Sequence, residues 1–243
     1  MPSLTVRLES LTYVEATMKR DYHRHLPHQV PEGFPIFLTW NLKGALPAEA
    51  IARLNAERER LARQPERRGE SRRDRQIRDG KLVFAMADRY LDGACSGPLD
   101  LKIPAAAKIV EDSVLYGTSE RYDLYAWCVM ANHVHVLFTP RWELKKVTQG
   151  IKGFTAHEIN TLNQQRGRVF WQDESYDHWA RDEQEMLRII HYIEQNPVAA
   201  GLCARAEDWP WSSAKLRDHW PVGTPYVGQA FQPDGSVAAR RSQ

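Results

Sequence analysis

One short stretch of the chain decides how it folds, and it reads Val129-Met130-Ala131-Asn132-His133-Val134-His135-Val136-Leu137-Phe138. Side chains alternate between the two faces of an extended strand, so His133 and His135 point to the same face. Val134, Val136 and Phe138 point to the other face, which can be buried. The first face then presents two imidazoles that can hold one metal ion. This arrangement suits chemistry on an oxyanion such as a phosphodiester.

A pair of histidines in a strand is more often structural than metal-binding, so the pair needs further support. The chain also holds a second copy, His23-Arg24-His25, which His28 follows. That copy lacks flanking β-branched residues and lies beside Pro27, so it predicts a polar loop rather than a site.

Support for the first pair comes from residues 182–196, which have the pattern of a helix. Asp182 is a good N-cap, acidic residues crowd the first turn, and Pro197 is expected to end the helix near Asn196. An apolar stripe at helical spacing is formed by Met186, Ile189, Ile190 and Ile193. Tyr192 and Asn196 are four residues apart at its flank, so the tyrosine can face a site while the helix stays anchored. The alternative is a tyrosine that is simply half-buried at the edge of the core.

Together these residues resemble the REP-associated tyrosine transposases, which belong to the single-tyrosine branch of the HUH endonucleases. The resemblance rests on His133-x-His135, on Tyr192 and Asn196, and on Phe170-Trp171-Gln172 between them. It extends from about Tyr22 to Ser213, with further matching stretches at residues 24–28, 176–179, 196–202 and 208–213.

The resemblance implies a role for each site residue. His133, His135 and Asn196 would bind a divalent cation, Mg²⁺ or Mn²⁺, and Tyr192 would attack DNA. The product would be a 5′-phosphotyrosine and a free 3′-hydroxyl, and the step could reverse to join new strands. The implied substrate is single-stranded, hairpin-forming DNA of the REP type. Magnesium prefers oxygen ligands, so a set of two histidines and an asparagine also suits manganese.

The order of the expected elements indicates an α+β fold. Strands are expected at residues 34–42, 122–130, 133–139 and 169–171, and helices at 48–79 (broken near Pro65 and Gly69), 105–116, 143–163 and 182–196. This is the order of a ferredoxin-like split βαβ antiparallel sheet with the catalytic tyrosine on a C-terminal helix. Sequence order alone leaves other α+β layouts open.

The chain is expected to form one main domain with appendages. Residues 1–30 are a polar lead-in, residues 31–215 the HUH domain with an arginine-rich insertion at about 48–100, and residues 216–243 a disordered tail. Trp209 and Trp211, which flank a proline, favour a segment pinned onto the core over stacking on unpaired bases.

Charge is distributed unevenly although the net charge is only +2. Residues 53–78 hold ten arginines against five acidic residues, and a second basic group consists of Lys145, Lys146, Lys152, Arg166 and Arg168. These clusters could follow a DNA phosphate backbone, or they could be solvated helix faces with ion pairs. Three cysteines without Cys-x-x-Cys spacing favour a reducing cytoplasm, and the lack of a long apolar stretch argues against a membrane span. The resemblance implies a bacterial protein.

Several alternatives stay open. Tyr176 is a second candidate nucleophile, with His178 beside it as an auxiliary residue. The chain could also be a catalytically silent protein that binds hairpin DNA, although such a protein needs no tyrosine opposite two histidines. A third alternative is an unrelated metallohydrolase, which would need a carboxylate base near the metal, and the sequence identifies none. Both a monomer and a homodimer are compatible with the sequence.

Overall fold

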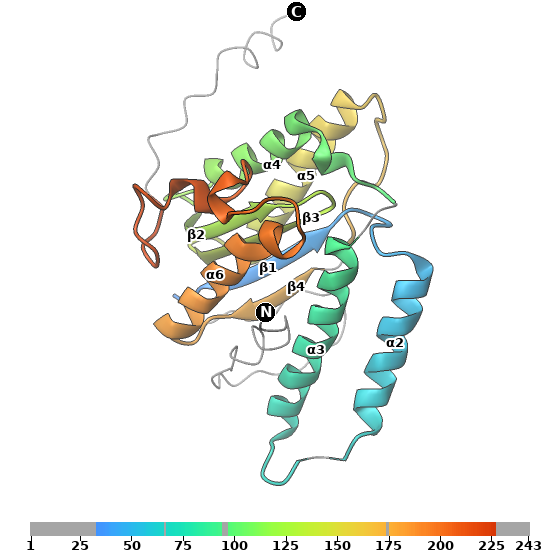
Figure 1. Ribbon diagram of the computed structural model, residues 1–243. Coiled ribbons are helices and arrows are strands. Elements are labelled where there is room, and N and C mark those ends of the chain that lie inside the picture. Colours follow the sequence, from blue (N-terminus) through green and yellow to red (C-terminus); the bar gives the residue numbers. More distant parts are fainter. Residues whose placement is uncertain (1–32, 66, 94–96, 174, 227–243) are drawn as a thin grey trace, which may run out of the picture.

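A four-stranded antiparallel sheet forms the centre of the computed structural model, which describes residues 33–226 apart from 66, 94–96 and 174 (Figure 1). The strands lie in the order β2-β3-β1-β4 and comprise β1 (Ile36–Asn41), β2 (Tyr122–Val129), β3 (His133–Pro140) and β4 (Tyr176–Trp179). The helices are α2 (Ala48–Arg63), α3 (Arg72–Asp92), α4 (Pro104–Tyr116), α5 (Leu144–Leu162) and α6 (Glu183–Ala199), with 3₁₀ turns η1 (Asp100–Lys102), η2 (Ala206–Asp208) and η3 (Ser213–Leu216). Strand order and direction confirm the ferredoxin-like fold.

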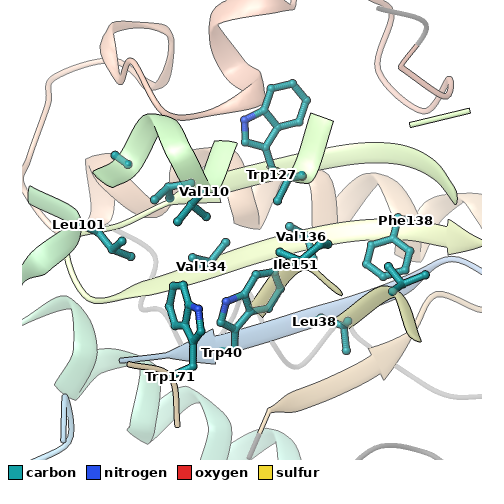
Figure 2. Close-up of a cluster of buried hydrophobic side chains, with 14 of the residues drawn as sticks. Leu38, Trp40, Leu101, Val110, Trp127, Val134, Val136, Phe138, Ile151 and Trp171 are labelled. Carbon is teal, nitrogen blue, oxygen red and sulfur yellow. The ribbon is translucent and has the colours of Figure 1, made fainter. Parts of the chain in front are cut away.

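One face of the sheet packs against α4 and α5 (Figures 1 and 2). Alternate residues of the two central strands supply this core, including Leu38, Trp40, Val134 and Val136, each at most 2% exposed. Burying an aliphatic side chain of this size contributes about 1.5–3 kcal/mol. The face predicted to be apolar is therefore the one that holds these helices.

The opposite face is covered mainly by α6. Phe37 of β1 and Leu137 of β3 pack there against Ile189, Ile190 and Ile193, so the predicted apolar stripe is confirmed as the buried side of the helix. His133 and His135 share the face of Leu137 because of the strand alternation. Both histidines consequently lie between the sheet and α6.

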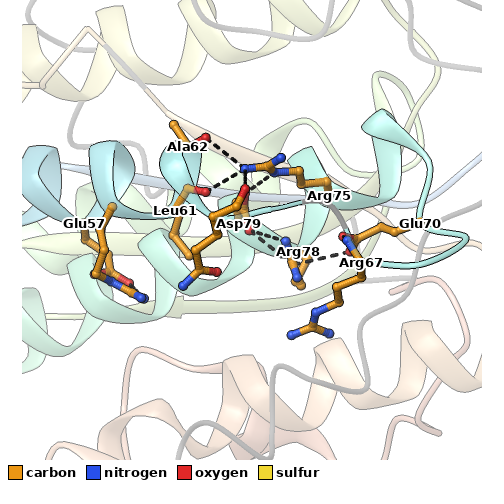
Figure 3. A network of polar contacts seen from close by, with 10 residues as sticks. Glu57, Leu61, Ala62, Arg67, Glu70, Arg75, Arg78 and Asp79 are labelled. Carbon is orange, nitrogen blue, oxygen red and sulfur yellow. Dashed lines mark hydrogen bonds and ion pairs between the residues drawn. The ribbon is translucent and has the colours of Figure 1, made fainter.

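Between β1 and α4, residues 48–92 form a hairpin of the two long helices α2 and α3 (Figure 1). Many of its arginines are in ion pairs within one helix or with the loop that joins the two helices, among them Arg53–Glu49, Arg60–Glu57, Arg63–Glu59, Arg75–Asp79 and Arg78–Glu70. Arg75 also donates to the carbonyls of Leu61 and Ala62 in the last turn of α2 (Figure 3). For these arginines, the alternative of an ion-paired helix face is correct.

Two predicted boundaries are wrong. Residues 169–171 are not a strand; Trp171 makes only an isolated bridge with Leu42, and the fourth strand is β4, which pairs with β1. The apolar residues 169–171 have the composition of a strand, whereas the true strand β4 is short and has polar residues in its middle, so local composition pointed to the wrong segment.

Pro197 does not end α6, which continues to Ala199. Proline removes one N–H and crowds the preceding turn, but the backbone beyond it stays hydrogen-bonded, because the amide of Ala200 donates to the carbonyl of Asn196.

The chain stays packed on the core beyond residue 215, where the sequence predicted the domain to end. Trp220 stacks on Trp127 with ring centroids 5.9 Å apart, and the amide of Tyr226 donates to the carbonyl of Leu124 at 2.7 Å. The indole of Trp209 donates to the carbonyl of Val129, which confirms a pinning role. The lead-in, with its three histidines, and residues 227–243 lie outside the described part of the chain.

Replacing Trp220 by alanine is expected to lower the free energy of unfolding by about 3–5 kcal/mol, because the variant leaves a cavity against Trp127. The matched control is Trp142→Ala, since Trp142 is 46% exposed and touches the guanidinium of Arg121 at the surface. That control should cost about 1 kcal/mol or less. Chemical denaturation of both variants measures the difference, and equal losses would contradict the pinning role of the C-terminal segment.

Candidate active site

His133 and His135 are brought to one point by their partners on the sheet. Their Nε2 atoms lie 3.0 Å apart. The Nδ1 atom of His135 lies 2.7 Å from the hydroxyl of Thr39, its cross-strand neighbour on β1. The Nδ1 atom of His133 lies 2.7 Å from Oδ1 of Asn132, whose Nδ2 donates to the carbonyl of Leu91. These contacts orient both Nε2 atoms toward the same place.

Both imidazoles are fully buried, and burial lowers the pKa of each to about 3. They are therefore neutral at physiological pH, which is the form that ligates metals. Two nitrogens that hold one ion at about 2.1 Å and at a right angle lie about 3.0 Å apart. The observed separation of the two Nε2 atoms matches that spacing.

Tyr192 projects from α6 toward the same place and is 3% exposed, so it lies deeper than the flank position expected from the sequence. Its ring meets His135 edge-on with centroids 5.9 Å apart. Its hydroxyl donates to Oδ2 of Asp88, a residue of α3. Burial, and then the neighbouring Asp88 carboxylate, raise the pKa of Tyr192 well above its usual value.

Asp88 is the residue of the site that sequence reasoning missed. It is 1% exposed, and burial raises its pKa, whereas His133, Tyr192 and Asn196 act in the opposite direction. Its Oδ1 atom lies 3.6 Å from Nε2 of His135. One donor atom each from Asp88, His133 and His135 lie within 4.8 Å of one another, which is close enough to share one cation. One turn further along α3, Asp92 lies 3.6 Å from Nε2 of His133.

The side chain of Asn196 lies beside Asp88, in the last turns of α6, and it is 2% exposed. Its Oδ1 atom is buried without a hydrogen-bond partner in the described protein, as is Oδ1 of Asp88. A buried oxygen without a partner costs free energy, and a bound cation would remove that cost. The donor set of two imidazole nitrogens and two such oxygens fits a divalent metal ion.

The two auxiliary candidates lie on β4. Tyr176 stacks on Phe84 of α3 with ring centroids 3.8 Å apart, and burial raises its pKa. Nε2 of His178 lies 2.8 Å from a carboxylate oxygen of Glu185 on α6. Both residues therefore make contacts that join β4 to the helices above it.

The structure does not bring the five basic candidates to the histidines. Lys145 and Lys146 are exposed on α5, which packs on the opposite face of the sheet, and Lys146 pairs with Glu143. Lys152 donates to the carbonyl of Gln172. Arg168 pairs with Asp100 at 2.7 Å, and Arg166 is exposed in the loop that follows α5. DNA contacts by these residues stay a prediction.

Replacing Thr39 by valine is expected to weaken Mn²⁺ binding about tenfold, because the hydroxyl that orients His135 is lost while the side-chain shape is kept. Titration of Mn²⁺ followed by electron paramagnetic resonance measures the change. The control is Thr148→Val on α5, where another buried hydroxyl bonds only to backbone carbonyls of its own helix. Unchanged affinity in Thr39→Val would show that the hydroxyl does not prepare the site.

Comparison with known proteins finds a family match for the segment that carries the histidines and Tyr192. Residues 113–196, which run from α4 to Asn196 and include both histidines and Tyr192, match the family model described as "Transposase IS200 like". A Haemophilus influenzae protein named as a REP-associated tyrosine transposase is 28% identical over 109 residues, which is 40% of this chain. The chain covers 62% of the length of that relative.

A solved structure described as a REP-associated tyrosine transposase bound to a REP hairpin aligns with a TM-score of 0.47 and 15% identity, over 88% of this chain and 94% of that chain. No helix in the described part of the chain is long and apolar enough to cross a membrane. The family match of residues 113–196 and the relative in H. influenzae confirm the resemblance expected from the sequence: this chain is similar to the REP-associated tyrosine transposases and carries an IS200-like transposase segment.

Proposed function

We propose that the protein is a metal-dependent nuclease and strand transferase that acts on single-stranded DNA through Tyr192. The observation that carries the proposal is the meeting of a tyrosine hydroxyl and two neutral imidazoles at one buried carboxylate. The similarity of residues 113–196 to IS200-like transposases supports the same assignment. Hairpin-forming DNA of the REP type is the substrate that the sequence resemblance implies, and the bacterial cytoplasm is the compartment where such DNA lies.

The cation, which we propose to be Mg²⁺ or Mn²⁺, would be held by His133, His135 and Asn196. When bound, it would neutralise a phosphate oxygen and favour the phenolate form of the tyrosine. The protein supplies the position of the nucleophile and its dry surroundings. Without a cation, the raised pKa of Tyr192 keeps the phenol protonated and unreactive.

In the proposed step, the Tyr192 oxygen forms a bond to phosphorus, and the bond between phosphorus and the 3′ oxygen of the preceding nucleotide breaks. The phenol releases one proton and the departing 3′ oxygen takes up one, so the exchange needs no further reagent. Because one ester replaces another, the step is reversible, and a different 3′-hydroxyl can attack the phosphotyrosine to join strands. The nucleophile and both histidines are buried, so a phosphodiester reaches them only when a covering element moves aside.

The metallohydrolase alternative gains one observation, because Asp88 is a carboxylate beside the two histidines. In a hydrolase, this carboxylate would activate a water molecule. In the structure, its Oδ2 atom already accepts the hydroxyl of Tyr192. The two functions differ in one product, since only the tyrosine mechanism leaves DNA attached to protein.

Replacing Tyr192 by phenylalanine is expected to abolish covalent attachment to single-stranded hairpin DNA, because only the attacking oxygen is lost. Binding of the same DNA should stay within about twofold of wild type. Denaturing gels of protein incubated with labelled DNA and Mn²⁺ measure the adduct, and a gel-shift assay measures binding. His133→Ala should also form no adduct, even at high Mn²⁺ concentration.

The matched control is Tyr176→Phe, which removes the hydroxyl of the other tyrosine considered as a nucleophile and keeps the ring that stacks on Phe84. It should form the adduct at about the wild-type rate. An adduct that persists in Tyr192→Phe and disappears in Tyr176→Phe would move the nucleophile to Tyr176. Cleavage by Tyr192→Phe without any adduct would favour the hydrolase, and binding without cleavage in wild type would favour a silent DNA-binding protein.

A further inference from the structure

The inserted α2–α3 hairpin reaches into the candidate active site, although it is remote from the histidines in sequence. The two ends of the insertion lie close together. The backbones at Gly44, before α2, and at Gly97, after α3, approach so closely that a Cβ atom added to Gly97 would lie 3.5 Å from the carbonyl oxygen of Gly44. Helix α3 leads back toward this place, and its C-terminal part brings Asp88 to the histidines. Leu91 accepts a hydrogen bond from Asn132, so the same part of α3 also contacts the turn before β3.

The two carboxylate oxygens of Asp88 have different surroundings. Oδ2 accepts the hydroxyl of Tyr192. Oδ1 has no hydrogen-bond partner in the described protein and lies 3.6 Å from Nε2 of His135 and 3.9 Å from Nε2 of His133. One carboxylate oxygen and two imidazole nitrogens thus face one another, and Oδ1 of Asp92 lies beside them, 3.6 Å from Nε2 of His133.

A buried carboxylate with one unpartnered oxygen is expensive unless a positive charge lies beside it. The guanidinium of Arg89, the next residue of α3, is turned to the backbone of its own helix and donates to the carbonyl of Ala85. A divalent cation between Oδ1 and the two Nε2 atoms would compensate the charge.

We propose that Asp88 has two roles in the nuclease: its Oδ1 atom ligates the divalent cation together with His133 and His135, and its Oδ2 atom holds the hydroxyl of Tyr192 beside that cation. The inference rests on the proposed function for its second half only. It makes the α2–α3 hairpin a part of the catalytic centre rather than a surface appendage. It also adds a charged oxygen to the ligands, and Mg²⁺ and Mn²⁺ prefer such donors.

The test uses the full-length protein and two readouts. The first is Mn²⁺ affinity in the absence of DNA, measured by electron paramagnetic resonance, which does not depend on activity. Asp88→Asn keeps the size of the side chain and should weaken Mn²⁺ binding at least tenfold. The same loss should appear in a Tyr192→Phe background, because ligation by Oδ1 does not require the phenol. Asp88→Ala should show a similar loss and guards against an effect specific to asparagine.

The second readout is the rate of adduct formation at saturating Mn²⁺, where the loss of affinity is overcome. Asp88→Asn should still react at least tenfold more slowly than wild type, because the carboxylate that holds the hydroxyl of Tyr192 is gone. The matched control is Asp79→Asn, which removes another α3 carboxylate that pairs with Arg75 and Arg78 far from the site. It should lower thermal stability without changing Mn²⁺ affinity.

Mn²⁺ affinity within twofold of wild type in a folded Asp88→Asn variant would overturn the role as a ligand. A wild-type adduct rate at saturating Mn²⁺ would overturn the role in positioning Tyr192. Equal losses of affinity in Asp79→Asn and Asp88→Asn would show that Asp88 acts only through the stability of α3. If wild type forms no DNA adduct but Asp88→Asn still loses Mn²⁺ affinity, the proposed nuclease function fails and the metal ligand stands.

Discussion

The site depends on two contacts that fix the imidazole rings through their Nδ1 atoms. Thr39 on the neighbouring strand meets Nδ1 of His135, and the side chain of Asn132 meets Nδ1 of His133. Because both Nδ1 atoms are engaged, both Nε2 atoms point toward Asp88, and they lie 3.0 Å from each other. A one-residue slip of β3 would turn both rings into the opposite core, so the sheet register and the position of the histidine pair are specified together.

The buried position of the site has consequences for its chemistry. Inside the protein the attraction between a cation and a carboxylate is stronger than in water, and competing water is excluded. The same surroundings raise the pKa of Tyr192, so its phenol stays protonated unless a positive charge lies beside it. In the proposed mechanism, attack by the tyrosine would therefore require both a cation and a DNA phosphate.

Local patterns predicted the parts of the site that lie within single elements. The alternation along β3 gave the shared face of His133 and His135, and the apolar stripe of α6 gave the side that carries Tyr192. Asp88 could not be predicted in this way. It is 104 residues from Tyr192, on a long, charged helix where sequence does not reveal which side meets the sheet.

The wrong predictions about the fold have a similar origin. Residues 169–171 have the composition of a strand, yet the edge of β1 pairs with β4, where Asp177 and His178 interrupt the apolar pattern. The aromatic residues after position 215 lie in a polar, proline-containing segment, and only the tertiary structure shows that Trp220 covers Trp127. The pairing of β1 and the packing of Trp220 are therefore determined by long-range contacts, which local composition does not reveal.

The central claim is that one cation joins the two imidazoles to the tyrosine. Diffraction from crystals of the full chain soaked in Mn²⁺, with anomalous data collected near the manganese absorption edge, tests it most directly. The account predicts a single strong anomalous peak bonded to Nε2 of His133 and of His135, next to Oδ1 of Asp88 and of Asn196. Manganese bound elsewhere, with no peak between the two imidazoles, would contradict it.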